Sequence, residues 1–126
     1  MNMLLAIACG GALGALARHK VDSVAMHLFG GGFPYGTTIV NIAGSFLLGL
    51  LAGGLALKFS LPLEGRAFLV VGFCGAFTTF SAFALDVAIL TERGNLMLAG
   101  VYVALSVAGA ILAMFGGLAV MRGLFA

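Results

Sequence analysis

The sequence predicts an all-α membrane protein: a single domain, residues 1–126, with four transmembrane helices, the third of them interrupted. Of the 126 residues, 63% are hydrophobic and only 8% are charged, and the mean hydropathy is +1.23. Four mostly apolar stretches are separated by short breaks, and each reaches the roughly 20 residues that a helix needs to cross a bilayer. The net charge of +2 gives no indication of nucleic-acid binding.

The first two predicted spans cover residues 3–28 and 37–57. A glycine-rich turn at residues 30–36 separates them, because glycine permits positive φ and Pro34 lacks a backbone donor. The second half of the first span carries Arg18, His19, Lys20 and Asp22 close together.

The third and fourth predicted spans cover residues 66–90 and 96–121. Residues 72–83 of the third span combine two glycines, three hydroxyl side chains and spaced phenylalanines. A helix that is interrupted at membrane depth frees backbone groups, which are tolerated only where they are buried in protein or line a cavity. The interruption therefore indicates a binding or conduction site.

Small residues recur four positions apart in three of the spans. The sets are Gly10 and Gly14, Gly49 and Gly53, and Gly109, Ala113 and Gly117. This spacing lets helix backbones approach closely in lipid, so it indicates packing and not function.

The basic residues do not fix an orientation in the membrane. With four spans, both termini lie on one side, together with Lys58, Arg66 and Arg122. The other side holds Arg93, and also Arg18 and Lys20 if the end of the first span reaches water. Lys and Arg in short loops normally set topology, and here the two sides balance. We therefore expect insertion in both orientations and an antiparallel homodimer. A fixed orientation with a weak signal remains an alternative.

Two polar strips lie inside the spans. Asn41 shares a face of the second span with Thr37 and Ser45, four residues away on either side. An unmatched amide in hydrocarbon costs a few kcal/mol, so Asn41 needs partners. An interhelical hydrogen bond and a place in a pore are both open. Tyr102 and Ser106 form a similar strip on the fourth span, of a kind that often reflects local packing.

Phe80 and Phe83 share a helical face, with Thr79 and Ser81 beside them. Phenylalanine in a membrane helix usually packs against lipid or core, but the electropositive edge of its ring can also face a small anion. Combined with Asn41 and the hydroxyls, such edges favour conduction of a small anion over tight binding.

Two charged residues at depth stay ambiguous. Charge inside a membrane is costly and suggests a function by default. Arg18 could draw anions into a vestibule or pair with a carboxylate. Asp86 could partner a basic residue on another helix or form the polar end of the third span.

Three motifs together resemble the small fluoride channel family called Fluc. They are residues 10–18 (GGALGALAR), residues 36–41 (GTTIVN), and Gly72-Phe73-Cys74-Gly75 followed by Thr78-Thr79-Phe80-Ser81-Ala82-Phe83. The resemblance covers essentially the whole chain. It implies a multi-pass protein of the bacterial inner membrane that exports fluoride passively. It also implies an antiparallel homodimer with two pores and a central structural sodium ion.

The resemblance also assigns roles to individual residues. It makes Phe80 and Phe83 the pore phenylalanines and Asn41 the pore amide, and it places Arg18 in an aqueous vestibule. Tyr102 and Ser106 would line an exit track, with Thr79 and Ser81 as neighbouring hydroxyls, and the backbone carbonyls of Gly75 and Thr78 would hold sodium. The chain departs from the family pattern at Ala76, Ala82 and Asp86, where glycine, threonine and glutamate are frequent.

Three other functions fit parts of the sequence. A proton-coupled multidrug-type exporter would need an acidic residue early in the chain, where this chain has Arg18. An intramembrane enzyme would use the Ser, His and Asp residues, but no nucleophile elbow or metal-ligand spacing is present. Cys9 and Cys74 fit packing positions better than a disulfide or a metal site. A purely structural role would leave Asn41 and the interrupted span unexplained.

Overall fold

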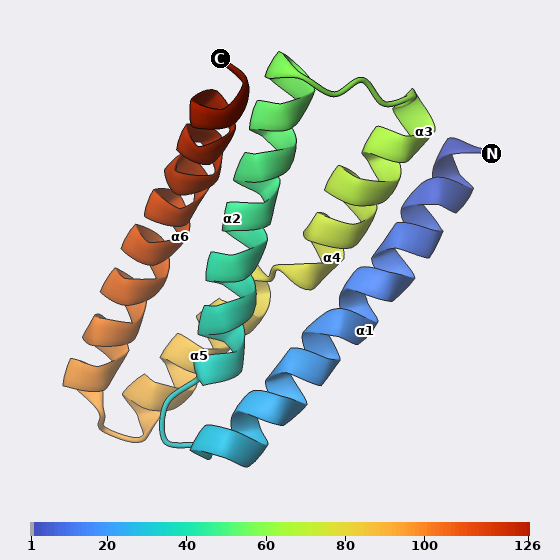
Figure 1. Ribbon diagram of the computed structural model, residues 1–126. Helices are drawn as coiled ribbons and strands as arrows, with labels where there is room; N and C mark the ends of the chain where they lie inside the picture. Colours follow the sequence, from blue (N-terminus) through green and yellow to red (C-terminus); the bar gives the residue numbers. More distant parts are fainter. Residues whose placement is uncertain (1) are drawn as a thin grey trace.

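The protein is a bundle of four long helical segments, seen here in a computed structural model that describes residues 2–126 (Figure 1). The segments are α1 (Met3–Phe29), α2 (Tyr35–Leu57), a composite third segment (Leu63–Glu92) and α6 (Leu96–Phe125). The third contains α3 (Leu63–Arg66), the π-helix η1 (Ala67–Cys74), α4 (Gly75–Phe77) and α5 (Phe80–Glu92). All four segments are long and apolar enough to cross a membrane, which confirms the predicted spans. The fourth continues past its predicted end at residue 121.

Local chemistry sets the ends of the helices. The Asn2 side chain caps α1 by accepting a hydrogen bond from the Leu4 N–H at 2.7 Å. Gly30 ends α1 with φ 77°, and Gly94 follows α5 with φ 82°, a backbone conformation that favours glycine. Pro34 precedes α2, where its missing N–H costs nothing.

The third segment passes from one side of the bundle to the other. Its first half, α3 to α4, lies along α1, whereas α2 lies along α6 (Figure 1). Its second half, α5, crosses behind α2 and packs on α6, where Phe83 and Leu90 form a buried cluster with Ala99 and Tyr102. The break between α4 and α5 therefore allows one span to contact both pairs of helices.

Glycines allow the closest helix contacts, as the small-residue spacing predicted. Gly10 and Gly14 of α1 lie directly against the backbone of residues 68–73, and Gly49 of α2 lies against Gly117 of α6. A Cβ atom at Gly117 would approach the Leu50 nitrogen to 2.7 Å. These two seams fix α1 to η1 and α2 to α6, and the break lies between them.

The sequence did not predict the π-helix that precedes the break. The N–H of Gly75 donates to the carbonyl of Val70, five residues earlier. Such wide turns are rare and occur frequently near functional sites. Here the π-helix directly precedes α4 and the interruption.

Candidate ion pathway at the broken helix

The interruption that residues 72–83 predicted is confirmed, and it is located at two threonines. Helix α4 ends at Phe77, and Thr78 (φ −88°, ψ 161°) and Thr79 (φ −156°, ψ 121°) are extended before α5 begins at Phe80. Extended residues cannot continue the helical hydrogen-bond ladder. The backbone groups of this short stretch therefore need partners from elsewhere in the bundle.

Asn41 of α2 supplies two of those partners. Its Nδ2 donates to the carbonyl oxygen of Thr79 at 3.0 Å, and its Oδ1 accepts from the Thr79 N–H at 2.7 Å. The amide thus satisfies both backbone groups of one extended residue. Of the two possibilities open for Asn41, the interhelical hydrogen bond is confirmed. Since Nδ2 carries two hydrogens, one N–H is left over for another acceptor.

The same rearrangement frees carbonyl oxygens at the end of α4. In a continuous helix, the Thr79 N–H would donate to the carbonyl of Gly75, and the Ala82 N–H to that of Thr78. Here the Thr79 N–H donates to Asn41, and the Ala82 N–H donates to the Thr79 hydroxyl at 3.1 Å. The carbonyls of Gly75 and Thr78 have lost their helical donors, as have those of Ala76 and Phe77 between them. The resemblance gave a sodium ion to the first and last of these four carbonyls.

A cavity of about 270 Å³, here called the phenylalanine cavity, opens beside the break. Five of the predicted pore residues line it: Asn41, Thr79, Phe80, Phe83 and Ser106. The two phenylalanine rings lie 5.5 Å apart between centroids, and their environments differ, with Phe83 8% exposed and Phe80 79% exposed. The Ser106 hydroxyl is buried without a hydrogen-bond partner among the described residues. The cavity therefore combines two aromatic rings with a hydroxyl that has no hydrogen-bond partner among the described residues.

Arg18 lines a second cavity, of about 210 Å³, here called the vestibule cavity. Thr37 of α2 lines it too, and Thr79 borders both this cavity and the phenylalanine cavity. Arg18 itself is half-buried, and no hydrogen bond within residues 2–126 occupies its side chain. The structure thus places Arg18 and Asp22 around a cavity that shares Thr79 with the phenylalanine cavity.

Tyr102 and Ser81 lie outside the phenylalanine cavity. Tyr102 is fully buried, with its ring 5.1 Å from that of Phe83 and edge-on to Phe33 at 5.4 Å between centroids. Its hydroxyl donates to the Asp86 carboxylate at 2.9 Å, so its only hydroxyl proton is already used. Ser81 is exposed on the first turn of α5. Their roles in the pathway stay predictions.

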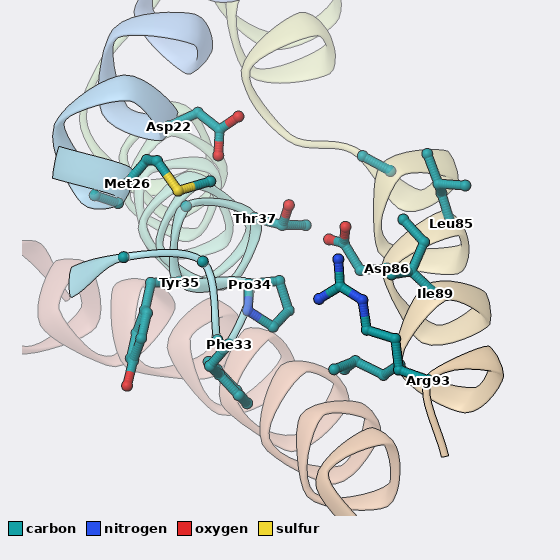
Figure 2. A pocket seen from close by; sticks show the side chains of 17 residues that line it. Asp22, Met26, Phe33, Pro34, Tyr35, Thr37, Leu85, Asp86, Ile89 and Arg93 are labelled. Carbon is teal, nitrogen blue, oxygen red and sulfur yellow. The ribbon is translucent and has the colours of Figure 1, made fainter. Parts of the chain in front are cut away.

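Asp86 faces a third cavity, of about 270 Å³, between the end of α1, the loop before α2, and α5 (Figure 2). Arg93 extends back toward Asp86 in this view, and Thr37 faces it from α2 (Figure 2). Through the hydrogen bond to Tyr102, Asp86 links α5 to α6. Asp86 is therefore an interhelical hydrogen-bond partner, but its partner is a tyrosine and not a basic residue. Thr37 lines this cavity as well as the vestibule cavity, so these two cavities are adjacent.

Sequence reasoning left two lining residues unassigned. Ser45 lines the phenylalanine cavity, and Thr37 lines the other two. Their four-residue spacing from Asn41 was the signal that could have selected them, since it puts all three on one face of α2. The pairing of Asn41 with Thr79 had no local signal, because it joins residues 38 positions apart.

A four-span fold whose third helix breaks beside cavities is typical of membrane transport proteins. The chain belongs to the CrcB-like family: the model described as "CrcB-like protein, Camphor Resistance (CrcB)" matches residues 5–118. This family membership accords with the resemblance that the motifs of the sequence carried.

Similar proteins match along almost their full length. "Fluoride-specific ion channel FluC" of Chelativorans sp. (strain BNC1) is 51% identical over 124 residues, which cover 98% of this chain and 99% of that protein. The protein of the same name from Hyphomonas neptunium is 49% identical over 127 residues and the full length of both chains. "Fluoride-specific ion channel FluC 2" of Nitrobacter hamburgensis is 46% identical, with 98% of this chain and 99% of that protein covered.

Replacing Asn41 with alanine should destabilise the fold, because it leaves the N–H and the carbonyl of Thr79 without partners. An unsatisfied buried polar group costs roughly 1–3 kcal/mol, so we expect a clear fall in the midpoint of thermal unfolding in detergent. Size-exclusion chromatography of heated samples measures this midpoint. The control is Thr91→Ala, because the Thr91 hydroxyl donates only to its own helix at an exposed site. Equal midpoints for the two variants would contradict the role given to Asn41.

Proposed function

We propose that this chain forms a passive channel that exports fluoride from the cytoplasm. The names of the relatives, which match over nearly the whole chain, support the choice of ion. The observation that carries the proposal is the phenylalanine cavity, which Phe80 and Phe83 line together with Asn41 and Ser106, whose hydroxyl has no partner among the described residues. Conduction suits this set better than catalysis, because its hydroxyls and amide are neutral donors with no base hydrogen-bonded to them among the described residues.

Fluoride is small and holds its water strongly, so its entry into a region of low dielectric constant would be prohibitive without replacement donors. The remaining N–H of Asn41 and the Ser106 hydroxyl offer such donors, and the ring edges add weaker positive potential. None of these groups carries a full positive charge. An ion can therefore be held at several weak sites in turn and still leave, as conduction requires.

Arg18 has a different part in the proposed pathway. It lines the vestibule cavity and not the phenylalanine cavity, so its charge raises the local concentration of anions without binding one inside the narrow region. Thr79 borders both cavities and gives an ion a hydroxyl contact between them. The order along the pathway is then Arg18, Thr79 and the phenylalanine rings.

We further propose that two chains assemble antiparallel, with two pores in the dimer. The Phe80 side chain is 79% exposed in the single chain, and packing against the second copy would bury it. Gly75, in the short helix α4 just before the break, is exposed in the single chain. The balance of basic residues between the two membrane sides supports opposite insertion of the two copies.

A sodium ion fits the break of such a dimer. The carbonyls of Gly75 and Thr78 are neutral oxygen donors without helical partners, and unwound backbone of this kind coordinates sodium in membrane proteins. Two chains would contribute four such oxygens near the two-fold axis. When bound, the ion would supply the positive charge that compensates the carbonyl dipoles, which makes its role structural.

The phenylalanine-lined pathway is tested by fluoride efflux from liposomes, recorded with a fluoride electrode without a proton gradient. We expect the double variant Phe80→Ala/Phe83→Ala to lose most of the wild-type flux, because the ring edges are removed and the passage fills with water. The matched control is Phe115→Ala, since Phe115 is 60% exposed on α6 and lies outside the phenylalanine cavity. Wild-type flux in the double variant would refute this pathway.

Opposite insertion of the two copies is tested with a topology reporter fused to the C-terminus. We expect reporter signal from both sides of the membrane in similar amounts, because Lys and Arg are balanced between the two sides. Adding two lysines to the loop at residues 58–62 should bias the reporter to one side. Signal confined to one side for the unmodified chain would overturn the antiparallel arrangement.

A further inference from the structure

The polar strip of Tyr102 and Ser106 on α6 does not extend along the whole phenylalanine cavity. Tyr102 and Ser106 are followed at the same four-residue spacing by Ala110 and then Met114. Ala110 and Ile111 nevertheless line the cavity beyond Ser106. Helix α6 therefore offers no side-chain donor to that part of the cavity.

Ser45 of α2 lies at this level. Helices α2 and α6 run in the same direction, since Ile42 contacts Gly109 and Gly49 lies against Gly117. Ser45 falls between these two contacts and lines the same cavity as Ser106 and Ala110. It also follows Asn41 by four residues, so both side chains are on the cavity face of α2.

The hydroxyl of Ser45 is not used inside the protein. Other helical hydroxyls donate to the carbonyl four residues earlier: Thr38 to Pro34 and Thr78 to Cys74, both at 2.9 Å. The Ser45 side chain makes no hydrogen bond within residues 2–126. Ser106, only 5% exposed, is unpartnered in the same cavity. Two free hydroxyls thus lie along one cavity, where an acceptor from outside the chain would satisfy them.

We propose that Ser45 is a further fluoride ligand, which extends the line of donors from α6 onto α2. The remaining Asn41 N–H, the Ser106 hydroxyl and the Ser45 hydroxyl form a neutral donor set along the cavity wall. An ion that leaves Ser106 meets Ser45 where Ala110 provides no donor. This inference rests on the fluoride conduction proposed above.

The test compares fluoride efflux from liposomes for three variants with the wild type, at fluoride concentrations below saturation. We expect Ser45→Ala to lower the flux about tenfold, which corresponds to roughly 1.4 kcal/mol. Ser45→Thr keeps the hydroxyl and should retain most of the flux. Ser45→Ala/Ala110→Ser returns a hydroxyl to the opposite wall and should recover much of the loss. Size-exclusion profiles are recorded for every variant.

Ser23→Ala is the matched control, because Ser23 is an exposed serine on α1 outside the phenylalanine cavity. Unchanged flux in Ser45→Ala, beside an active wild type, would overturn the assignment of Ser45 alone. If Ser45→Thr also loses flux, and Ala110→Ser does not restore the flux lost in Ser45→Ala, then Ser45 has a packing role. That result would also overturn the assignment of Ser45 as a fluoride ligand. A wild type that moves no fluoride would remove the proposed function itself, together with this inference.

Discussion

The arrangement depends on how one interrupted helix satisfies its backbone inside a membrane. Hydrocarbon provides no hydrogen bonds, so each N–H and carbonyl released at Thr78 and Thr79 must find a partner in the protein, a cavity or an ion. Asn41 takes both groups of Thr79, and the Thr79 hydroxyl takes the N–H of Ala82. Two of the N–H groups at the break are thereby satisfied. On the acceptor side, the carbonyls of residues 75–78 have lost their helical donors, and those of Gly75 and Thr78 are among them.

Close packing on both sides holds the break in place. The contact of Gly10 and Gly14 with residues 68–73 fixes the first half of the third span against α1. The contact of Gly49 with Gly117 fixes α2, and with it Asn41, against α6. Since proteins deform little at such close contacts, Asn41 and Thr79 meet in one register. The same packing leaves Thr79 in the lining of both the vestibule cavity and the phenylalanine cavity.

The sequence predicted the features that depend on local pattern. Hydropathy marked the four spans, the residues of 72–83 marked the interruption, and four-residue glycine spacing marked the helix contacts. Features that depend on tertiary register were out of its reach. Nothing near Asn41 indicates that its partner is Thr79, and nothing near Tyr102 indicates that its hydroxyl donates to Asp86. Ser45 had a local signal, its spacing from Asn41, but only the shared cavity with Ser106 gives that spacing a meaning.

The most direct test of the whole account is the efflux of fluoride from sealed vesicles that contain the purified wild-type protein. Potassium fluoride and potassium chloride are loaded in parallel, and valinomycin carries the compensating potassium current, so that no proton gradient drives transport. The account predicts rapid loss of fluoride and retention of chloride, because a narrow set of neutral donors and ring edges replaces the water of the smaller ion. Retained fluoride, or chloride lost at the same rate, would contradict it.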